Sequence, residues 1–349
     1  MTNSSSGLQQ FAQDLAGECG LALYASCRRP GYHLDLAVGE LGNATPATVG
    51  DEFQLYCSSK PVMAQAAVWP LCERYGLGVL NLSLDELVPD LRVVGRWDRP
   101  PTLRELLAHD CGLGSPTGLE YVFYSESRRI DYGTKLSVSS TPEFSEVGLQ
   151  TVLRQLAAAE FGTPLGALVR VHLDELGLED RLRLTGSSQR LVPHFERVAG
   201  TRIPLLHELL PDRLENEQIA LVGLQGSASG LADWGFRFMR RAGNVETDIV
   251  AEVIERELHC LPAGRLDKQT GRISSYAMGF MANLAAHGIS TTVVDSIGHT
   301  GLLCSSVMLL DRTTSSSYVV LSSDIEFAEA GGVPGAAVRS LLRFMEACK

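Results

Sequence analysis

The 349-residue sequence has no apolar run long enough to cross a lipid bilayer. Stretches such as residues 277–286 are well short of the roughly 18–20 residues that a membrane-spanning helix needs. The first 27 residues contain no lysine or arginine, so they lack the positively charged start of a secretory signal peptide. These absences argue against a membrane or exported protein, and we expect a soluble protein of the cytoplasm.

Positive charge is scarce as well. The sequence has 30 lysines and arginines against 41 aspartates and glutamates, which gives a formal net charge of −11. Such a charge repels a phosphate backbone on average, so no nucleic-acid partner is expected. The eight cysteines show no paired spacing, and the glycines form neither a Rossmann nor a P-loop pattern. We therefore expect no metal, no organic cofactor, and cysteines that are mostly reduced and buried.

The composition, 45% apolar and 20% charged, is that of a folded protein. The apolar run 21–25 and the alternating run 32–38 flank turn residues at 28–31, which predicts a β-hairpin. Apolar residues then recur at three- and four-residue spacing, which is typical of helices. Helices are predicted over these segments: 59–71, 103–107, 147–161, 164–176 and 227–241.

Strand patterns return late in the chain. Three strands and a final helix are predicted there: 291–294, 306–310, 318–321 and 338–348. This order predicts an α/β (α+β) fold in which an antiparallel sheet, flanked by helices, is built from both termini. We expect a sheet domain of residues 1–55 and 245–349, an inserted, mainly helical domain of residues 56–244, and an active site in the cleft between them.

One short segment carries candidate chemistry. In the sequence Phe-Gln-Leu-Tyr-Cys-Ser-Ser-Lys, a turn leads into a helix whose first residues include Cys57 and Lys60. Residues three apart lie on one helix face, so the thiol and the amine can meet. A helix start and a nearby cation both favour the thiolate, the nucleophilic form of cysteine. Taken alone, the pattern fits a buried cysteine beside a surface lysine better, because Cys-x-x-Lys is short and common.

Further segments follow in a defined order. Residues 101–113 (PTLRELLAHDCGL) are similar to a Leu-Leu-x-His-x-Ser-Gly-Leu signature, and residues 143–149 (EFSEVGL) stand where Tyr-Ser-Asn would precede a helix. Residues 174–180 (DELGLED) resemble a Pro-Leu-Gly-Met-x-Asp turn without its proline. Residues 225–230 (QGSASG) resemble a glycine- and serine-rich turn into a helix. Residues 297–302 (IGHTGL) resemble a Lys-Thr-Gly or His-x-Gly strand.

Together these segments resemble the serine β-lactamase and penicillin-binding-protein superfamily, on the branch of class C β-lactamases, esterases and transacylases. The resemblance extends from about residue 20 to the C-terminal helix and implies a β-lactamase-like fold. Cys57 then replaces the nucleophilic serine, Phe144 the usual tyrosine and Glu146 the usual asparagine. A cysteine loses its proton far more readily than a serine, so it needs no tyrosine to relay that proton. The two substitutions are therefore consistent with each other.

The resemblance also implies roles for other residues. Lys60, Glu146 or His299 would transfer the proton, and these alternatives stay open. The backbone amides of Cys57 and Leu302 would form the oxyanion hole. Phe144, Thr300 and Gly301 would line the substrate site.

A cysteine nucleophile forms a thioester, which amines attack readily compared with water. The sequence therefore predicts a transacylase or an amide- or ester-forming enzyme of natural-product biosynthesis. Its partners would be a small-molecule acyl donor, such as a carrier-protein or coenzyme A thioester, and an amine or alcohol acceptor. Three alternatives remain: an esterase, amidase or thioesterase; an inactive binding protein of the same fold; and a cysteine introduced into a serine enzyme, which leaves Phe144 unexplained.

Overall fold

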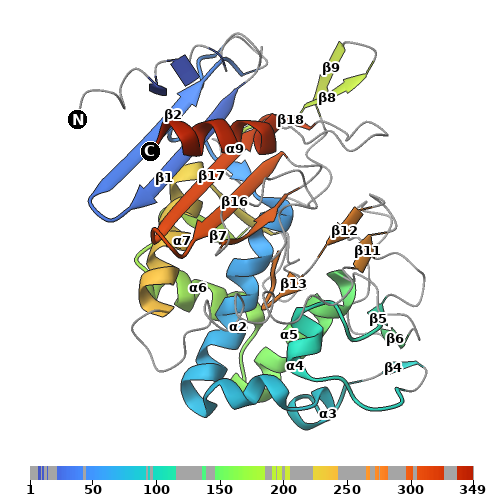
Figure 1. Cartoon of the computed structure of the whole chain (residues 1–349). Coiled ribbons are helices and arrows are strands. Elements are labelled where there is room, and N and C mark those ends of the chain that lie inside the picture. Colours follow the sequence, from blue (N-terminus) through green and yellow to red (C-terminus); the bar gives the residue numbers. More distant parts are fainter. Residues whose placement is uncertain are drawn as a thin grey trace.

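The largest sheet in the described part of the chain has seven strands, all antiparallel (Figure 1). In order across the sheet, its strands are β13 (Tyr276–Ala277), β14 (Phe280–Met281), β15 (Ser296–Thr300), β16 (Ser306–Asp311), β17 (Ser316–Ser322), β1 (Leu23–Arg29) and β2 (Tyr32–Val38). Because β1 pairs with β17, the sheet is built from both ends of the chain, as predicted. The structure is a computed structural model that describes residues 7–8, 10–11, 14, 22–41, 45–91, 93–94, 97–114, 136–138, 146–184, 191–193, 195–198, 201–204, 223–242, 265–267, 272–274, 276–281, 296–301, 305–325 and 336–348.

The predicted N-terminal hairpin is confirmed. Strands β1 and β2 pair from Leu23–Val38 to Arg29–Tyr32, and the chain reverses at Pro30 and Gly31. Gly31 has φ +72°, a backbone conformation that suits a residue without a side chain. The late strands β16 and β17 and the final helix also match their predicted positions, while the predicted strand at 291–294 lies outside the described residues.

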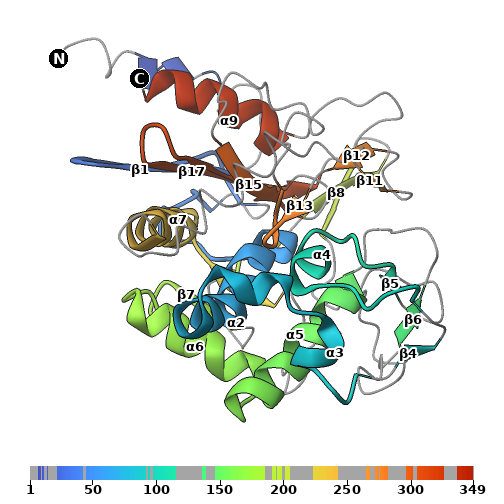
Figure 2. The ribbon, with the colours of Figure 1, turned by 60° about the horizontal axis from the view of Figure 1, so that its bottom comes forward.

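One helix covers each face of the sheet, as Figure 2 shows from the edge. Helix α9 (Ala336–Ala347) packs on β1, β16 and β17 from one side, and α7 (Ala228–Ala242) packs on the same three strands from the other. A side chain at Gly235 of α7 would overlap Leu310 of β16, so the glycine permits the close approach of helix and sheet. Strands β16 and β17 are consequently buried along their whole length.

Helix α2 (Lys60–Tyr75) forms the centre of the helical part. Its first ten residues are all buried, as expected for a helix surrounded by other elements. It contacts α5 (Glu146–Phe161) and α6 (Leu165–Glu175), two helices that the spacing predicted. The same part contains η2 (Leu77–Asn81), α3 (Leu84–Leu87), α4 (Leu103–Leu107), β4 (Val93–Val94), β5 (Leu113–Gly114) and β6 (Leu136–Val138).

A three-stranded sheet connects the helical part to α7. Its strands are β3 (Phe53–Gln54), β10 (Leu224–Gly226) and β7 (Leu182–Leu184). After β10 the Ser227 hydroxyl accepts a hydrogen bond from the Gly230 amide at 3.1 Å, which stabilises the start of α7. The predicted turn into a helix at residues 225–230 is therefore confirmed. The described residues form three further sheets. One contains β8 (Phe195–Val198), β9 (Thr201–Pro204) and β18 (Asp324–Ile325), another β11 (Arg265–Asp267) and β12 (Arg272–Ser274), and the third β4, β5 and β6.

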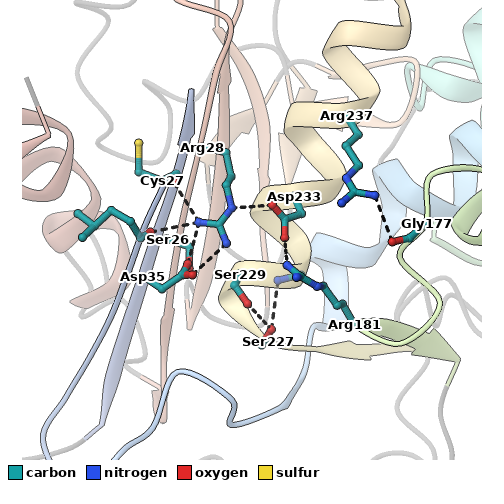
Figure 3. A network of polar contacts seen from close by, with 12 residues as sticks. Ser26, Cys27, Arg28, Asp35, Gly177, Arg181, Ser227, Ser229, Asp233 and Arg237 are labelled. Atoms are coloured by element: carbon teal, nitrogen blue, oxygen red, sulfur yellow. Dashed lines mark hydrogen bonds and ion pairs between the residues drawn. The ribbon is translucent and has the colours of Figure 1, made fainter. Parts of the chain in front are cut away.

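A buried ionic network joins the hairpin to α7 (Figure 3). The Arg28 side chain is 3% exposed and donates from Nε to Asp233 at 2.6 Å. Its two terminal nitrogens donate to the Asp35 carboxylate at 2.8 and 3.0 Å. Arg181 binds the second oxygen of Asp233. Burial alone would lower the pKa of Arg28, but the hydrogen bonds to Asp35 and Asp233 raise it above its ordinary value.

The division into residues 1–55 with 245–349 and residues 56–244 stays a prediction. Helix α7, although it falls in the second range, lies on the sheet. The longest helices of the described residues, α2 and α5, have 16 residues each, and none of the described helices could span a bilayer.

Candidate active site

Cys57 lies in a tight turn that leads directly into α2. The turn is the 3₁₀-helix η1 (Tyr56–Ser59), and α2 begins at the next residue, Lys60. Side chains three apart eclipse one another in a 3₁₀-helix, so Cys57 and Lys60 lie on the same side of the turn. Cys57 is partly exposed. Cys57 is therefore less buried than Ser58, Ser59 and Lys60, which follow it.

The residue before Cys57 has a strained backbone. Tyr56 has φ +44°, in the left-handed region that costs a non-glycine residue on the order of 1 kcal/mol. The flanking chain holds this conformation, because the Leu55 amide donates to the Leu224 carbonyl at 2.9 Å and the Ser58 amide to the Leu55 carbonyl at 3.0 Å. Burial raises the pKa of Tyr56 to about 12. Strain of this kind is common at active sites.

Two fully buried serines fix the turn to its surroundings. The Ser58 and Ser306 hydroxyls share a hydrogen bond of 2.8 Å, which joins η1 to the start of β16. The Ser59 hydroxyl accepts a hydrogen bond from the Leu224 amide at 3.3 Å, which joins η1 to β10. The turn is thus held by a hydrogen bond to β16 on one side and a hydrogen bond to β10 on the other. Together these two bonds fix the position of Cys57.

Lys60 is buried, with 1% of its surface exposed. The sequence interpretation that paired a buried cysteine with a surface lysine is therefore wrong on both residues, since Cys57 is the more accessible of the two. Lysines are rarely fully buried unless they are paired.

Strand β15 lies against this turn. It contacts both η1 and α2 and carries the predicted residues His299 and Thr300, which are 2% and 6% exposed. A side-chain carbon at Gly301, which follows the strand, would overlap the Ser306 hydroxyl and lie 3.0 Å from the Leu55 carbonyl oxygen. The end of β15 therefore approaches the backbone just before η1, and only glycine fits there.

The His299 ring has a defined orientation. Its Nδ1 lies 2.7 Å from the carbonyl oxygen of Thr300. A carbonyl oxygen only accepts hydrogen bonds, so Nδ1 carries the proton and donates. In the neutral ring the lone pair is then on Nε2, the atom that would accept a proton.

An aromatic neighbour of His299, Tyr276, was not identified from the sequence as a site residue. The Tyr276 ring on β13 lies between His299 and His109, with ring-centroid distances of 6.0 and 4.8 Å. His109 belongs to the motif at 101–113 and is buried, with φ +54°. The motif includes His109 but does not predict its contact with the Tyr276 ring, because Tyr276 is 167 positions away in the sequence.

Three predicted residues are not placed beside the thiol. Glu146 is the first residue of α5, where a helix was expected, but its side chain lies outside the described part. Phe144 and Leu302 also lie outside the described residues, so their roles stay predictions. Among the described residues, no group of three or more His, Cys, Asp or Glu side chains could hold a metal ion.

Neither protein-family models nor curated protein sequences match the chain. Solved structures match nearly all of it. EstCE1, a hydrolase with promiscuous acyltransferase activity, is 17% identical with a TM-score of 0.71 over 99% of this chain and 98% of its own.

Two further structures show the same likeness. A mutant of simvastatin synthase from Aspergillus terreus is 15% identical, with a TM-score of 0.66 over 99% of this chain and 95% of its own. An octameric penicillin-binding-protein homologue from Pyrococcus abyssi is 16% identical, with a TM-score of 0.64 over 98% and 77%. The TM-scores show that the fold is shared, whereas identities this low leave the reaction open. The chain therefore has the fold of serine β-lactamases and penicillin-binding proteins, as the sequence predicted.

Proposed function

We propose that this protein is an enzyme that transfers acyl groups through a thioester on Cys57. The observation that carries the proposal is the placement of Cys57, which is partly exposed, follows a strained residue and precedes a buried lysine by one turn. Strand β15, with His299, lies against the same turn. These observations support a site in which Cys57 is the nucleophile and Lys60 and His299 are candidate bases.

The reaction divides into two steps. In the first, a base takes the Cys57 proton, the sulfur attacks the carbonyl carbon of the donor, and the leaving group departs with a proton. In the second, an amine or alcohol attacks the thioester carbonyl, and the Cys57 sulfur leaves and is protonated again. The oriented ring of His299 supports this residue as the base. The position of Lys60, one turn from the sulfur, supports the lysine as an alternative. Glu146 remains the third candidate.

Both steps pass through a tetrahedral oxyanion. We assign its stabilisation to the backbone amides of Cys57 and Leu302, and substrate contacts to Phe144, Thr300 and Gly301. Each oxyanion donor is worth about 3 kcal/mol of transition-state stabilisation in acyl transfer. The donor would be a small-molecule acyl compound, for example a thioester of coenzyme A or of a carrier protein, in natural-product biosynthesis.

Intact-protein mass spectrometry with a short synthetic acyl thioester tests the proposal. We expect an adduct of one acyl group on Cys57, stable in buffer and discharged by added amine. Cys111→Ala is the matched control, because burial raises the pKa of the Cys111 thiol to about 12 and the adduct should form without it. Absence of an adduct with every donor tried would favour a binding protein.

Hydrolysis is the second candidate function. It is favoured by the likeness to EstCE1, a hydrolase that also transfers acyl groups. In the same experiment, an adduct that decays in buffer as fast as in amine would identify an esterase, amidase or thioesterase in place of a transferase.

Substituting Gly301 by alanine tests the contribution of β15. The added carbon would push the strand end away from Leu55 and Ser306, and displacing catalytic groups by about 1 Å can cost on the order of 100-fold in rate. We expect the rate of adduct formation to fall by about this factor. Gly78→Ala is the control, since a side-chain carbon there meets no atom within 4 Å. Equal rates for both variants would contradict the role of β15.

A further inference from the structure

Two buried cysteines face each other between the sheet and α9, away from the candidate active site. Cys27 on β1 is 0% exposed, and Cys348, directly after α9, is 1% exposed. Both belong to the apolar cluster that fills the space between the sheet and this helix. Neither residue has a part in the proposed acyl transfer.

The periodicity of the two elements brings the thiols together. On β1, alternate residues Leu23, Ala25 and Cys27 belong to this cluster. On the helix side, Leu341, Phe344 and Cys348 belong to it at helical spacing, and the Cys348 amide donates to the Phe344 carbonyl at 3.0 Å, which continues the helical turn. The Cys27 and Cys348 thiols are close enough to influence each other's ionisation. The pair therefore results from the packing of α9 on β1.

Nearby charges distinguish the two thiols. The hydrogen bond from Cys348 lowers the pKa of Cys27 against the effect of burial, and Arg29 and Arg28 lower it further, while Asp35 opposes them. The hydrogen bond to Cys27 and burial raise the pKa of Cys348. A lowered pKa favours Cys27 as the sulfur that attacks peroxide, and Cys348 is then the neighbouring cysteine that resolves the sulfenic acid.

We propose that Cys27 and Cys348 form an oxidation site, which hydrogen peroxide converts into a disulfide between β1 and the C-terminal end of α9. Peroxide suits the site because it is nearly as small as water and needs only a local opening at the helix end, where Glu346 is exposed. The disulfide would tie the last turn of the chain to the sheet.

The chemistry balances in two steps. The Cys27 thiolate attacks one peroxide oxygen, the O–O bond breaks, and a sulfenic acid and hydroxide form. The Cys348 sulfur then attacks the sulfenic sulfur, the S–S bond forms and the S–O bond breaks. The proton of the Cys348 thiol and the departing hydroxide give water. Two electrons pass from the two thiols to the peroxide.

Peptide mapping of the native full-length protein after peroxide treatment tests this site. We expect a linked peptide containing Cys27 and Cys348, which dithiothreitol resolves into its parts. In a Cys57→Ala background, where the proposed nucleophile cannot be oxidised, intact mass should fall by two hydrogen atoms. The crosslink closes a very long loop, so Tm should rise by about 5 °C and return on reduction.

Two variants and one control complete the experiment. Cys348→Ala and Cys27→Ala should each abolish the linked peptide and the rise in Tm, and Cys72→Ala, a buried cysteine of α2, should retain both. If either variant fails to fold, the presence or absence of the linked peptide in the peroxide-treated wild-type protein tests the proposal. A native protein in which Cys27 stays reduced, or in which the link forms only after denaturation, would overturn the proposal. Acylation of Cys57 is measured separately, so the two proposals fail independently.

Discussion

Replacement of Cys57 by alanine is expected to abolish the acyl adduct and to lower turnover by at least about 1,000-fold, as the loss of the nucleophile does in known acyl-transfer enzymes. The fold should persist, because the turn is anchored by Ser58 and Ser59 and the Cys57 side chain is partly exposed. Steady-state kinetics with the best donor, together with the Tm of the variant, checks both parts. A variant with unaltered turnover would show that the chemistry lies elsewhere.

The Cys57→Ser variant separates this mechanism from that of a serine enzyme. A serine needs help in losing its proton, and Phe144 provides no hydroxyl for that task. We therefore expect only weak activity, well below that of the cysteine enzyme. Robust activity with serine would contradict the argument that residues 57 and 144 changed together, and would favour a serine enzyme into which a cysteine was introduced.

The largest effect on stability is expected at Asp233. Its carboxylate is nearly inaccessible and binds Arg28, whose side chain is 3% exposed, and also Arg181 (Figure 3). Asp233→Ala would leave the Arg28 guanidinium buried with Asp35 as its remaining carboxylate. Removal of one partner of a buried pair costs about 3–5 kcal/mol, and we expect about 3 kcal/mol here because Asp35 remains. Urea unfolding of the variant and the wild type measures this difference.

Two comparisons make that result specific. Asp174→Ala, at an exposed position of α6, should change the free energy of unfolding little. A double variant, Arg28→Met with Asp233→Leu, should recover much of the loss, because apolar residues of similar size avoid the cost of an unpaired buried charge. If Asp233→Ala unfolds at the same urea concentration as the wild type, the network does not hold α7 to the hairpin.

Local patterns were sufficient for much of the fold. The hairpin of β1 and β2 follows from an apolar run before Pro30 and Gly31 and an alternating run after them, and α4 follows from the apolar spacing of residues 103–107. Both depend on residues close in the sequence. The motif order then located Cys57, Lys60 and His299, which the structure brings to one region through the contact of β15 with η1 and α2.

Long-range packing and backbone strain could not be predicted in the same way. Arg28 and Asp233 are 205 positions apart, and no local pattern connects them. The left-handed backbone of Tyr56 cannot be predicted from the sequence either. Tyrosine has no preference for that conformation, and only the surrounding hydrogen bonds impose it. The burial of Lys60 follows from the central place of α2, which spacing alone does not reveal.

The pairing of β1 with β17 has a consequence for how the chain folds during its synthesis on the ribosome. Strand β1 begins at Leu23, yet β17, its partner on the side away from β2, begins only at Ser316. At a synthesis rate of about 5–20 residues per second, the edge of β1 that pairs with β17 stays unpaired for tens of seconds. Nascent chains stalled before and after Ser316 should therefore differ sharply in protease resistance, and chaperone occupancy should be greatest in that interval.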